Sequence, residues 1–255
     1  MTSGGFRKFA PMKDTQNQID HRRIDIRKVG VKTVSYPITL RDKAKKEQNT
    51  IATLNMYVNL PHRFKGTHMS RFIEILNEFH GKIDIRNFHH ILEKMKERLD
   101  AEASHLEMEF PYFFTAGGAN NADGALAVRQ CTVIMIGSLV ESSNIQFKLI
   151  LPIILPRFAQ PGGNLPRLAG HWGRLEVTVR FKAFLWLEDL LSHIEKGIEL
   201  EVAALAPGDH KTLSVEALVK RVGQCLAALP EIACYSILVE NLGADYSTFA
   251  TLEST

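Results

Sequence analysis

Hydrophobic and polar residues alternate along several stretches of the chain, which is the pattern of a half-buried β-strand. The clearest case runs from Ala52 through Leu54, Met56 and Val58 to Leu60, with more polar residues between them. A period of two predicts a strand that turns one face toward a core. Four such stretches lie in the first half of the chain, at residues 29–40, 50–60, 105–114 and 127–136.

Between the second and third stretches the apolar residues recur at helical spacing instead. One helix is predicted from about Ser70 to His80, and a second follows a break at Gly81. The apolar face of the second helix consists of Phe88, Ile91, Leu92, Met95 and Leu99. The first half of the chain therefore has the element order ββααββ.

The second half repeats this order. Strands are predicted at residues 145–154, 175–181, 234–240 and about 246–252, and two apolar helical faces lie between the second and third of them. No sequence identity between the halves is visible, so the repeat is one of element order only. The order predicts an α+β protein of two tandem modules, each an antiparallel sheet covered by a helix pair. We place the modules at residues 26–140 and 141–255, after an N-terminal arm at residues 1–25.

Composition is that of an ordinary globular protein, and it excludes several classes of function. A formal net charge of +3, with no Lys/Arg-rich helix, argues against a nucleic-acid partner. No apolar run approaches the length of a membrane span or resembles a signal peptide, so we expect no membrane association and a cytoplasmic location. The three cysteines, Cys131, Cys225 and Cys234, form no metal-binding or disulfide pattern and sit in apolar segments.

A corner between the strand ending at Leu60 and the following helix concentrates possible chemistry. It contains the helix breakers Pro61 and Gly66, two histidines and three cations, among them Lys65 and Arg71. Cations and backbone N–H groups at a helix start suit an anion such as a phosphate. The alternative is a solvated turn whose cations face water.

The corner also carries a resemblance to a known family. The run resembles the signature of the prokaryotic GTP cyclohydrolases of type IB, which open the guanine ring of GTP to form 7,8-dihydroneopterin triphosphate in folate and pterin biosynthesis. The matching residues are Lys65-Gly66-Thr67-His68-Met69-Ser70-Arg71-Phe72, and a second match comprises Asp14-Thr15-Gln16-Asn17, Asp20, Arg22 and residues 26–32. The resemblance implies a purine nucleotide or pterin as ligand, with Lys65, His68 and Arg71 among the substrate-binding residues.

The resemblance also implies a fold and an assembly. Type IB enzymes are similar to other tunnelling-fold (T-fold) proteins, whose chains carry two such modules and associate edge to edge into barrels. A homo-oligomer, specifically a homotetramer, is therefore expected. The residues alone lead in the same direction, because open sheet edges need partners or cover.

His171 is the first candidate for the chemistry. It lies in Gly170-His171-Trp172-Gly173-Arg174, which lines up with the family's Gly-Ala-His-Asn-Gln-Arg, whose histidine is a metal ligand. The resemblance makes His171 a metal ligand or an acid/base group, and the alternative is a loop histidine without a role. The preceding loop, residues 155–164, has no cysteine, whereas the family's Leu-Cys-Pro-Cys-Ser-Lys supplies a zinc ligand there.

The C-terminal segment contributes a second group of candidates. Glu240 and Asn241 match the family's Glu-Asn, but its downstream carboxylate and two histidines have no counterpart here. Asp245 is the one nearby group that could still bind a metal. By resemblance the metal is zinc or manganese, held by His171, Glu240 and Asp245. The alternative is that no metal binds, because the cysteine ligand is missing.

Two further sets of carboxylates are candidates. Glu216 begins the last helix at the place where T-fold proteins use a glutamate to accept two N–H groups from a purine or pterin edge, and the resemblance gives it that role. A glutamate at a helix start is also favourable with the helix dipole, which needs no ligand. Glu107 and Glu109 share one strand face; a solvated sheet surface explains them without catalysis.

Three functions are compatible with these residues. The first is a metal-dependent type IB GTP cyclohydrolase with a rebuilt metal site. The second is a catalytically inactive homologue that keeps the fold and binds a purine or pterin ligand or a family partner. The third is a different reaction on a related heterocycle.

Overall fold

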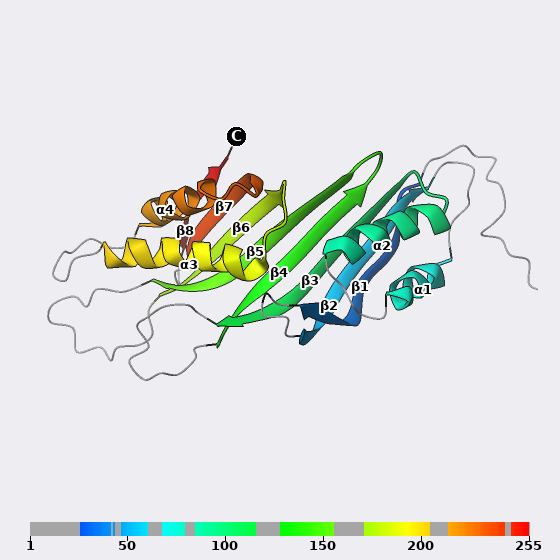
Figure 1. Cartoon of the computed structure of the whole chain (residues 1–255), viewed down its shortest axis with the longest axis horizontal. Coiled ribbons are helices and arrows are strands. Elements are labelled where there is room, and N and C mark those ends of the chain that lie inside the picture. Colours follow the sequence, from blue (N-terminus) through cyan, green and yellow to red (C-terminus); the bar gives the residue numbers. More distant parts are fainter. Residues whose placement is uncertain are drawn as a thin grey trace, which may run out of the picture.

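The described part of the chain forms one antiparallel sheet with helices on a single face (Figure 1). The computed structural model describes residues 26–41, 43, 47–60, 68–79, 85–115, 128–155, 171–204, 214–242 and 246–254. Within these residues the elements are β1 (Ile26–Arg41), β2 (Glu47–Leu60), α1 (Ser70–Glu78), α2 (Ile85–Arg98), β3 (Ala103–Thr115), β4 (Val128–Leu139), β5 (Ser143–Leu155), β6 (His171–Phe181), α3 (Leu187–Ala203), α4 (Val215–Ala227), β7 (Ile232–Leu242) and β8 (Ser247–Glu253).

The predicted α+β T-fold class and its doubled ββααββ order are confirmed. The strands follow one another in the sheet in chain order, and every neighbouring pair is antiparallel. The two halves share this sheet, since β4 pairs with β5 from Leu139 opposite Ser143 to Thr132 opposite Ile150. The tight turn between these strands lies at residues 140–142, where we placed the module boundary, and the division into modules stays a prediction.

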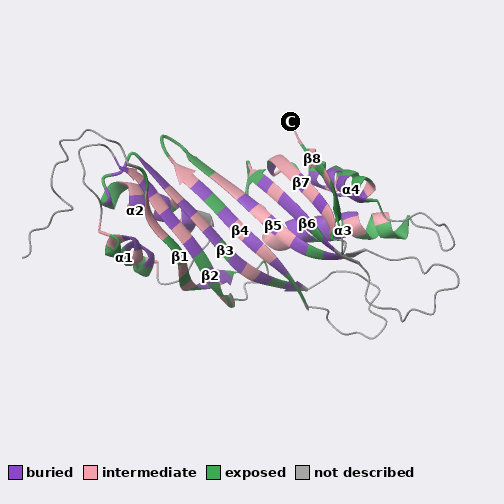
Figure 2. Ribbon diagram, turned by 180° about the vertical axis from the view of Figure 1, so that it is seen from behind, coloured by how far each residue is buried: buried purple, intermediate pink, exposed green. Residues whose placement is uncertain are grey.

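The sheet separates a core face from an open face. On the core face, side chains of alternate residues pack under the helices, and Leu54 and Met56 of β2, with Phe72 of α1 and Phe88 of α2, are fully buried. α1 and α2 cover the first half of the sheet, and α3 and α4 cover the second (Figure 1). Seen from the other side, the strands show buried residues alternating with intermediate and exposed ones (Figure 2). Among the described helices, none combines the length and the hydrophobicity that a membrane span requires.

Strand β1 approaches β2 so closely that one position requires glycine. A Cβ added at Gly30 would lie 1.9 Å from the carbonyl oxygen of Met56. The strand is irregular on either side, with register shifts between Ile26 and Val29 and between Val31 and Val34. In the second irregularity Thr33 has a φ of 54°, and its N–H donates to Asn55 Oδ1 over 3.0 Å. A side-chain acceptor thus stabilises a backbone conformation that a β-branched residue rarely adopts.

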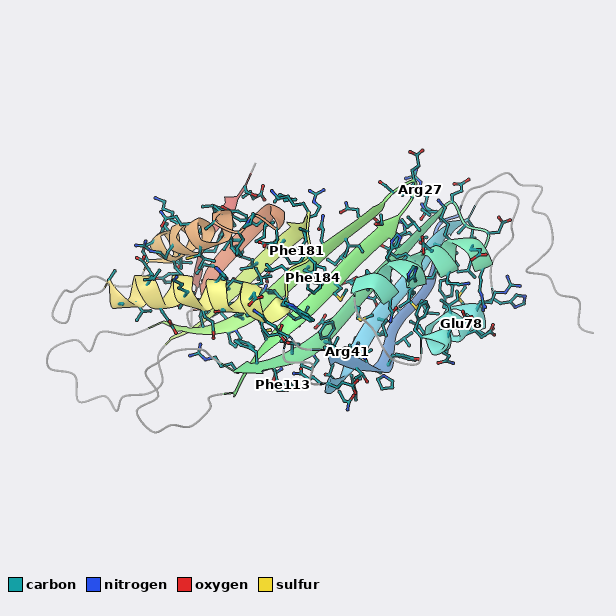
Figure 3. The ribbon with its side chains drawn as sticks, viewed as in Figure 1. Arg27, Arg41, Glu78, Phe113, Phe181 and Phe184 are labelled. Carbon is teal, nitrogen blue, oxygen red and sulfur yellow. The ribbon has the colours of Figure 1, made fainter. Side chains whose placement is uncertain are left out.

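Contacts across the helix layer join the two halves of the chain. Lys43, beyond β1, forms an ion pair with Asp189 of α3 (Nζ–Oδ1 2.6 Å), and its backbone N–H donates to Glu188 Oε1. The same oxygen accepts from the hydroxyl of Tyr112 in β3 over 2.5 Å. Figure 3 places Phe184, which stacks edge-on against Trp186, in the region between the two helix pairs.

Candidate functional site

The predicted anion-binding corner is only partly described. Lys65 lies outside the described residues. His68 precedes Met69, the N-cap of α1, and Arg71 is the second residue of that helix; both side chains are half-buried. The helix start has no side-chain cap and no acidic residue in its first turn. The N–H groups of Arg71 and Phe72 donate to the carbonyls of His68 and Met69, so these two are not free for an anion. The substrate-binding role of this corner stays a prediction.

Glu216 lies in the first turn of α4 and is exposed. The preceding Ser214 is the N-cap, and its hydroxyl accepts from the N–H of Ala217 over 3.0 Å. Because the cap does not involve Glu216, its carboxylate is not required to satisfy the helix start. The purine-anchor role and the helix-dipole role both remain open for this residue.

His68 and Arg71, at the start of α1, and Glu216, at the start of α4, lie toward opposite edges of the sheet (Figure 1). α1 contacts β1 through the hydroxyl of Tyr36, which donates to the carbonyl of Leu76 over 3.1 Å. α4 contacts β7 through the hydroxyl of Tyr235, which donates to the carbonyl of Gly223 over 3.1 Å. These strands are six positions apart in the sheet, a separation of roughly 30 Å at about 4.8 Å per strand. One small ligand cannot contact both groups of residues within a single chain.

Two of the residues predicted at the metal, His171 and Glu240, lie toward the same end of β6 and β7. His171 is the first residue of β6, and its backbone pairs with Leu155 of β5; its side chain lies outside the described part, as does Asp245. In β7, Glu240 stands opposite Arg174 and Asn241 opposite Gly173. The strand register thus brings the backbones of His171 and Glu240 to the same end of the sheet, and their roles stay predictions.

A chain of charged side chains crosses the open face beside this end, and the sequence analysis did not predict it. Glu176 of β6 is only 6% exposed, although the four described helices all lie on the opposite face of the sheet. Its Oε1 contacts a terminal guanidinium nitrogen of Arg174, and its Oε2 contacts the ammonium of Lys148 in β5. Arg174 also faces Glu240 of β7, with 3.9 Å between Nε and Oε2. Apolar and polar residues alternate over residues 175–181, which puts Glu176 on the polar side of its strand. That pattern does not reveal the cations Lys148 and Arg174 that surround its carboxylate.

The described residues do not assemble a metal site. Among them, no group of three or more His, Cys, Asp or Glu side chains could hold an ion. Glu240 supplies one carboxylate, already facing a guanidinium, and Asn241 supplies an amide oxygen that is buried without a hydrogen-bond partner among these residues. A zinc site needs about four ligands, usually including imidazole or thiolate. These donors do not fit that requirement without His171 and Asp245.

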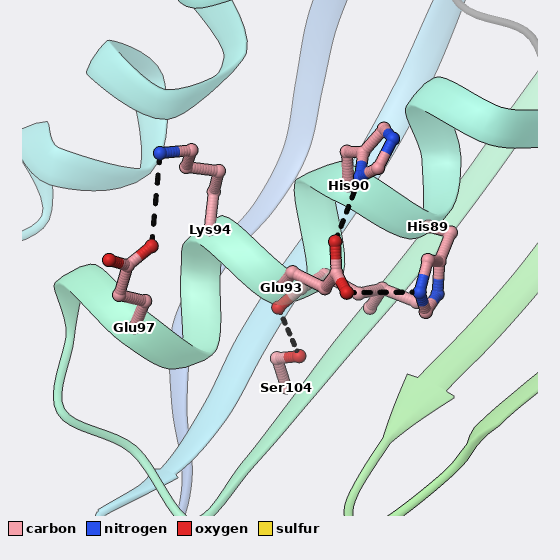
Figure 4. Close-up of polar contacts among 7 residues, drawn as sticks. His89, His90, Glu93, Lys94, Glu97 and Ser104 are labelled. Carbon is pink, nitrogen blue, oxygen red and sulfur yellow. Dashed lines mark hydrogen bonds and ion pairs between the residues drawn. The ribbon is translucent and has the colours of Figure 1, made fainter.

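Other titratable clusters lie away from this end. On α2, both carboxylate oxygens of Glu93 are engaged, one by His89 (3.2 Å) and one by His90 (2.8 Å) (Figure 4). The hydrogen bond from His90, followed by the charges of both imidazoles, lowers the pKa of Glu93. The carboxylate is about half exposed, so this is a solvated polar cluster on a helix surface. The pattern of α2 could have indicated it, because positions three and four apart share a helix face.

A shallow cavity of about 220 Å³ opens on the sheet near the start of β7, at the opposite end from Glu240. In it the guanidinium of Arg180 donates two hydrogen bonds to Cys234 Sγ, over 3.1 and 3.3 Å. None of the predicted site residues lines this cavity.

Comparison with known proteins gives one consistent family. Residues 12–241 match the family model described as type I GTP cyclohydrolase folE2. A GTP cyclohydrolase FolE2 from Syntrophus aciditrophicus is 38% identical over 256 residues, covering 95% of this chain and 99% of that protein. A GTP cyclohydrolase FolE2 from Geobacter metallireducens is 39% identical over 258 residues, covering 95% of this chain and 97% of that protein.

Solved structures support the fold alone. The uricase of Arthrobacter globiformis superposes with a TM-score of 0.55 at 10% identity, covering 89% of this chain and 92% of that chain. The urate oxidase of Bacillus sp. TB-90 gives a TM-score of 0.55 at 11% identity, covering 90% of this chain and 100% of that chain. At such low identity the shared feature is the arrangement of strands and helices.

Proposed function

The chain belongs to the GTP cyclohydrolase FolE2 family, and from this premise we propose that it binds GTP and converts it to 7,8-dihydroneopterin triphosphate. The observation that carries the proposal is the nearly full-length match to relatives of that name. In this proposal His68 and Arg71, with Lys65, bind the phosphates, and Glu216 accepts the N–H donors of the guanine edge. His171, Glu240 and Asp245 would hold a zinc or manganese ion, which would supply an activated water.

The proposed GTP site lies between two copies of the chain. Arg71 and Glu216 are separated by six strand positions within one chain, so a nucleotide that contacts both must receive them from different chains. The outer edges of β1 and β8 have no partner strand among the described residues. Unpaired edges favour strand addition, which supports a homo-oligomer; we propose the homotetramer implied by the resemblance.

A second candidate function is GTP or pterin binding without turnover. It is favoured by one specific observation: no cysteine is present between residues 132 and 224, so the thiolate ligand that the resemblance implies has no counterpart in this segment. The fold and the purine-binding residues would then persist in a catalytically inactive homologue.

Two measurements separate these candidates. Pterin formation from GTP, followed by fluorescence with added zinc or manganese, tests the enzyme; no turnover with either metal rejects it. Titration calorimetry with GTP and with a pterin tests binding, using Glu216→Ala and, as a matched control, the exposed helix residue Glu199→Ala. If the wild-type protein binds neither ligand, or if both variants bind like the wild type, the purine-anchor role is rejected.

Light scattering coupled to gel filtration tests the assembly. A mass of four chains supports the tetramer. A mass of one chain, at concentrations where GTP binds, rejects the shared site.

A further inference from the structure

We propose that the two outer edges of the sheet pair across two copies of the chain in one register. Residues 35–41 of β1 take up β8 of the second copy, with Arg41 opposite Ser247 and Ser35 opposite Glu253. The strands run antiparallel in this seam, because β1 and β8 have opposite directions within the sheet and both helix layers stay on one face. The register follows from strand geometry alone, whereas its consequence for the GTP site rests on the proposed function.

Strand β1 is divided into an irregular and a regular part. Both of its register shifts against β2 lie before Val34, and from Val34 to Arg41 every residue has a partner in β2 without interruption. Bulges and lysines are devices that keep an edge strand from pairing with another chain, and the irregular part contains Lys28 and Lys32. The edge that remains open to an added strand is therefore residues 34–41. It is one residue longer than β8, which has seven.

The two faces of the sheet select the register. In β1, Tyr36 and Ile38 face the core under the helices, and in β8, Ala250 and Leu252 do so. Residues opposite each other in neighbouring strands share a face, so even-numbered residues of β1 must lie opposite even-numbered residues of β8. The regular part of β1 can hold the whole of β8 in two registers, and this condition is met only when Arg41 lies opposite the first residue of β8.

The directions of the backbone hydrogen-bonding groups agree with this register. The N–H of Ser254 donates to the carbonyl of Tyr235 over 2.9 Å. Since the direction alternates along an antiparallel strand, the odd-numbered residues of β8 point away from β7. In β1, Pro37 has no N–H to donate to β2, and a proline in a sheet turns that side to the free edge. The odd-numbered residues of β1 thus also point outward, and the register places them opposite those of β8.

Side chains along the two edges also match. Phe249 is 67% exposed on the open face of β8, and in the seam it would lie opposite Thr39 and diagonal to the exposed Pro37. Glu253 is the charged residue of β8. It would lie at the irregular start of β1, which has cations and no carboxylate. An exposed aromatic ring and an acidic end thus meet apolar and basic counterparts.

The seam has a consequence for the second half of the proposed GTP site. Helix α4 ends at Ala227, shortly before β7 begins at Ile232, so α4 runs back over β7. Its first turn, with Glu216, therefore points toward the far end of β7. Ser247 begins β8 at that same end, because it pairs with Leu242. In the seam this end lies beside Arg41 of the other copy.

The first half of the site points to the same place. Glu78 ends α1 and forms an ion pair with Arg98, which ends α2 (2.5 Å). Strand β3 follows α2 closely, and its start pairs with the end of β2, so the end of α1 lies toward the irregular start of β1. The start of α1, with Arg71, then points toward Arg41. Arg71 of one copy and Glu216 of the second copy thus lie toward one end of the seam, as a shared nucleotide requires.

Disulfide cross-linking of the full chain tests the register. In a Cys225→Ser/Cys234→Ser background, Thr39→Cys/Phe249→Cys and Arg41→Cys/Ser247→Cys should each give covalent dimers under mild oxidation. Opposite positions have Cα atoms about 5.5 Å apart, which a disulfide can bridge. Thr39→Cys/Thr251→Cys is the matched control. Its cysteines would be diagonal neighbours, about 7–8 Å apart, and its yield of dimers should be at least tenfold lower.

Three results would overturn the proposal. Lys32→Cys/Phe249→Cys dimers in equal yield would show that the irregular part of β1 takes up β8. Dimers of Ala250→Cys alone would show that β8 pairs with β8 of the second copy. Absence of cross-links in both opposite pairs, whether the protein is an oligomer or a single chain, would show that these edges do not meet.

A mixing experiment separates the register from the proposed function. Arg71→Ala and Glu216→Ala chains should each bind GTP at least tenfold more weakly than the wild type. When they are unfolded and refolded together, calorimetry should show about a quarter of the wild-type number of sites, because half of the random pairs contain one intact site of two. Cross-links without this recovery mean that the proposed GTP site fails and the register stands. Recovery without cross-links overturns the register.

Discussion

The rings of Tyr57 and His105 stack across strands β2 and β3, with their centroids 4.7 Å apart and their planes inclined by 16°. The ammonium of Lys28 in β1 also lies over the Tyr57 ring, 4.7 Å from its centroid. His105 Nε2 is also 3.2 Å from Asn59 Oδ1, one residue before the end of β2. Because Leu60 leads into the predicted anion-binding corner, this stack fixes the strand end from which the corner departs.

The stack predicts a pH dependence of stability. Burial, and then the charge of Lys28, lower the pKa of His105. The unfolded chain, with a histidine pKa of about 6.5, therefore takes up the proton first as the pH falls. The stability due to neutral His105 is fully present above pH ~6.5 and is lost as the pH falls from there toward the folded-state pKa. Urea unfolding at pH 7.5 and at successively lower pH values measures this loss.

Two variants isolate the contribution of His105. His105→Phe keeps an aromatic ring in the stack and should remove this part of the pH dependence, even if its stability at pH 7.5 is lower. Lys28→Met should reduce the dependence without abolishing it, because burial is the larger cause. An unchanged pH profile in His105→Phe would assign the dependence to other groups.

Gly30→Ala should cost about 3 kcal/mol of unfolding free energy, because a backbone atom obstructs the new methyl group. The added Cβ would lie 1.9 Å from the carbonyl oxygen of Met56, so β1 must move away from β2. Gly223→Ala in α4 is the matched control: the nearest atoms to its Cβ would be side-chain methyl groups, of Leu252 at 3.3 Å and of Ile237 at 3.7 Å. Its effect should stay within about 1 kcal/mol, since alanine also favours the helix. Equal losses in the two variants, measured by urea unfolding, would contradict the close approach of the strands.

The sequence was sufficient to predict the fold class, because the same order of strand and helix patterns occurs in both halves of the chain. The alternation around Leu54 and Met56 sets which face of β2 enters the core, and the helical spacing around Phe72 and Phe88 sets which faces cover it. The predicted strand at residues 175–181 proved longer, since β6 begins at His171. Local pattern does not define where pairing with a neighbouring strand begins, and it cannot show that β4 and β5 join both halves into one sheet.

The candidate site was predictable only where single residues carry the signal. A motif can identify Arg71 or Glu216 as candidates, but it cannot reveal that they lie at opposite edges of one sheet. Burial of Glu176 depends on Lys148, which is 28 positions away in the chain, and on Arg174 beside it. The structural roles of these charges arise from strand register, which the sequence does not specify.

Tyr112→Phe should destabilise the protein by about 1–2 kcal/mol, which is typical for losing a hydrogen bond to a charged group. The hydroxyl of Tyr112 donates to Glu188 Oε1 over 2.5 Å, and the tyrosine is only 4% exposed. Lys43→Met is the contrasting variant, because its ion pair with Asp189 is largely solvent-exposed and should contribute less than about 1 kcal/mol. Guanidinium unfolding measures both. A larger loss of unfolding free energy in Lys43→Met than in Tyr112→Phe would contradict this prediction. It would show that the surface ion pair contributes more than the buried hydroxyl to the contact between the two halves of the chain.

Cys131 should resist thiol reagents in the folded protein. Burial is the largest effect on this thiol, and together with the nearby charge of Glu195 it raises the pKa of Cys131 to about 12. At pH 8 only about one molecule in 10,000 would then carry the reactive thiolate.

Labelling with Ellman's reagent should leave one thiol unmodified in the native protein, while all three cysteines react in guanidinium. Cys131→Ala should leave native labelling unchanged and reduce labelling of the unfolded chain by one. Equally fast labelling of Cys131 in the native protein and in the unfolded chain would contradict this prediction. It would mean that β4 opens on the timescale of the reaction. The sheet that joins the two halves would then be much less stable than its buried strands indicate.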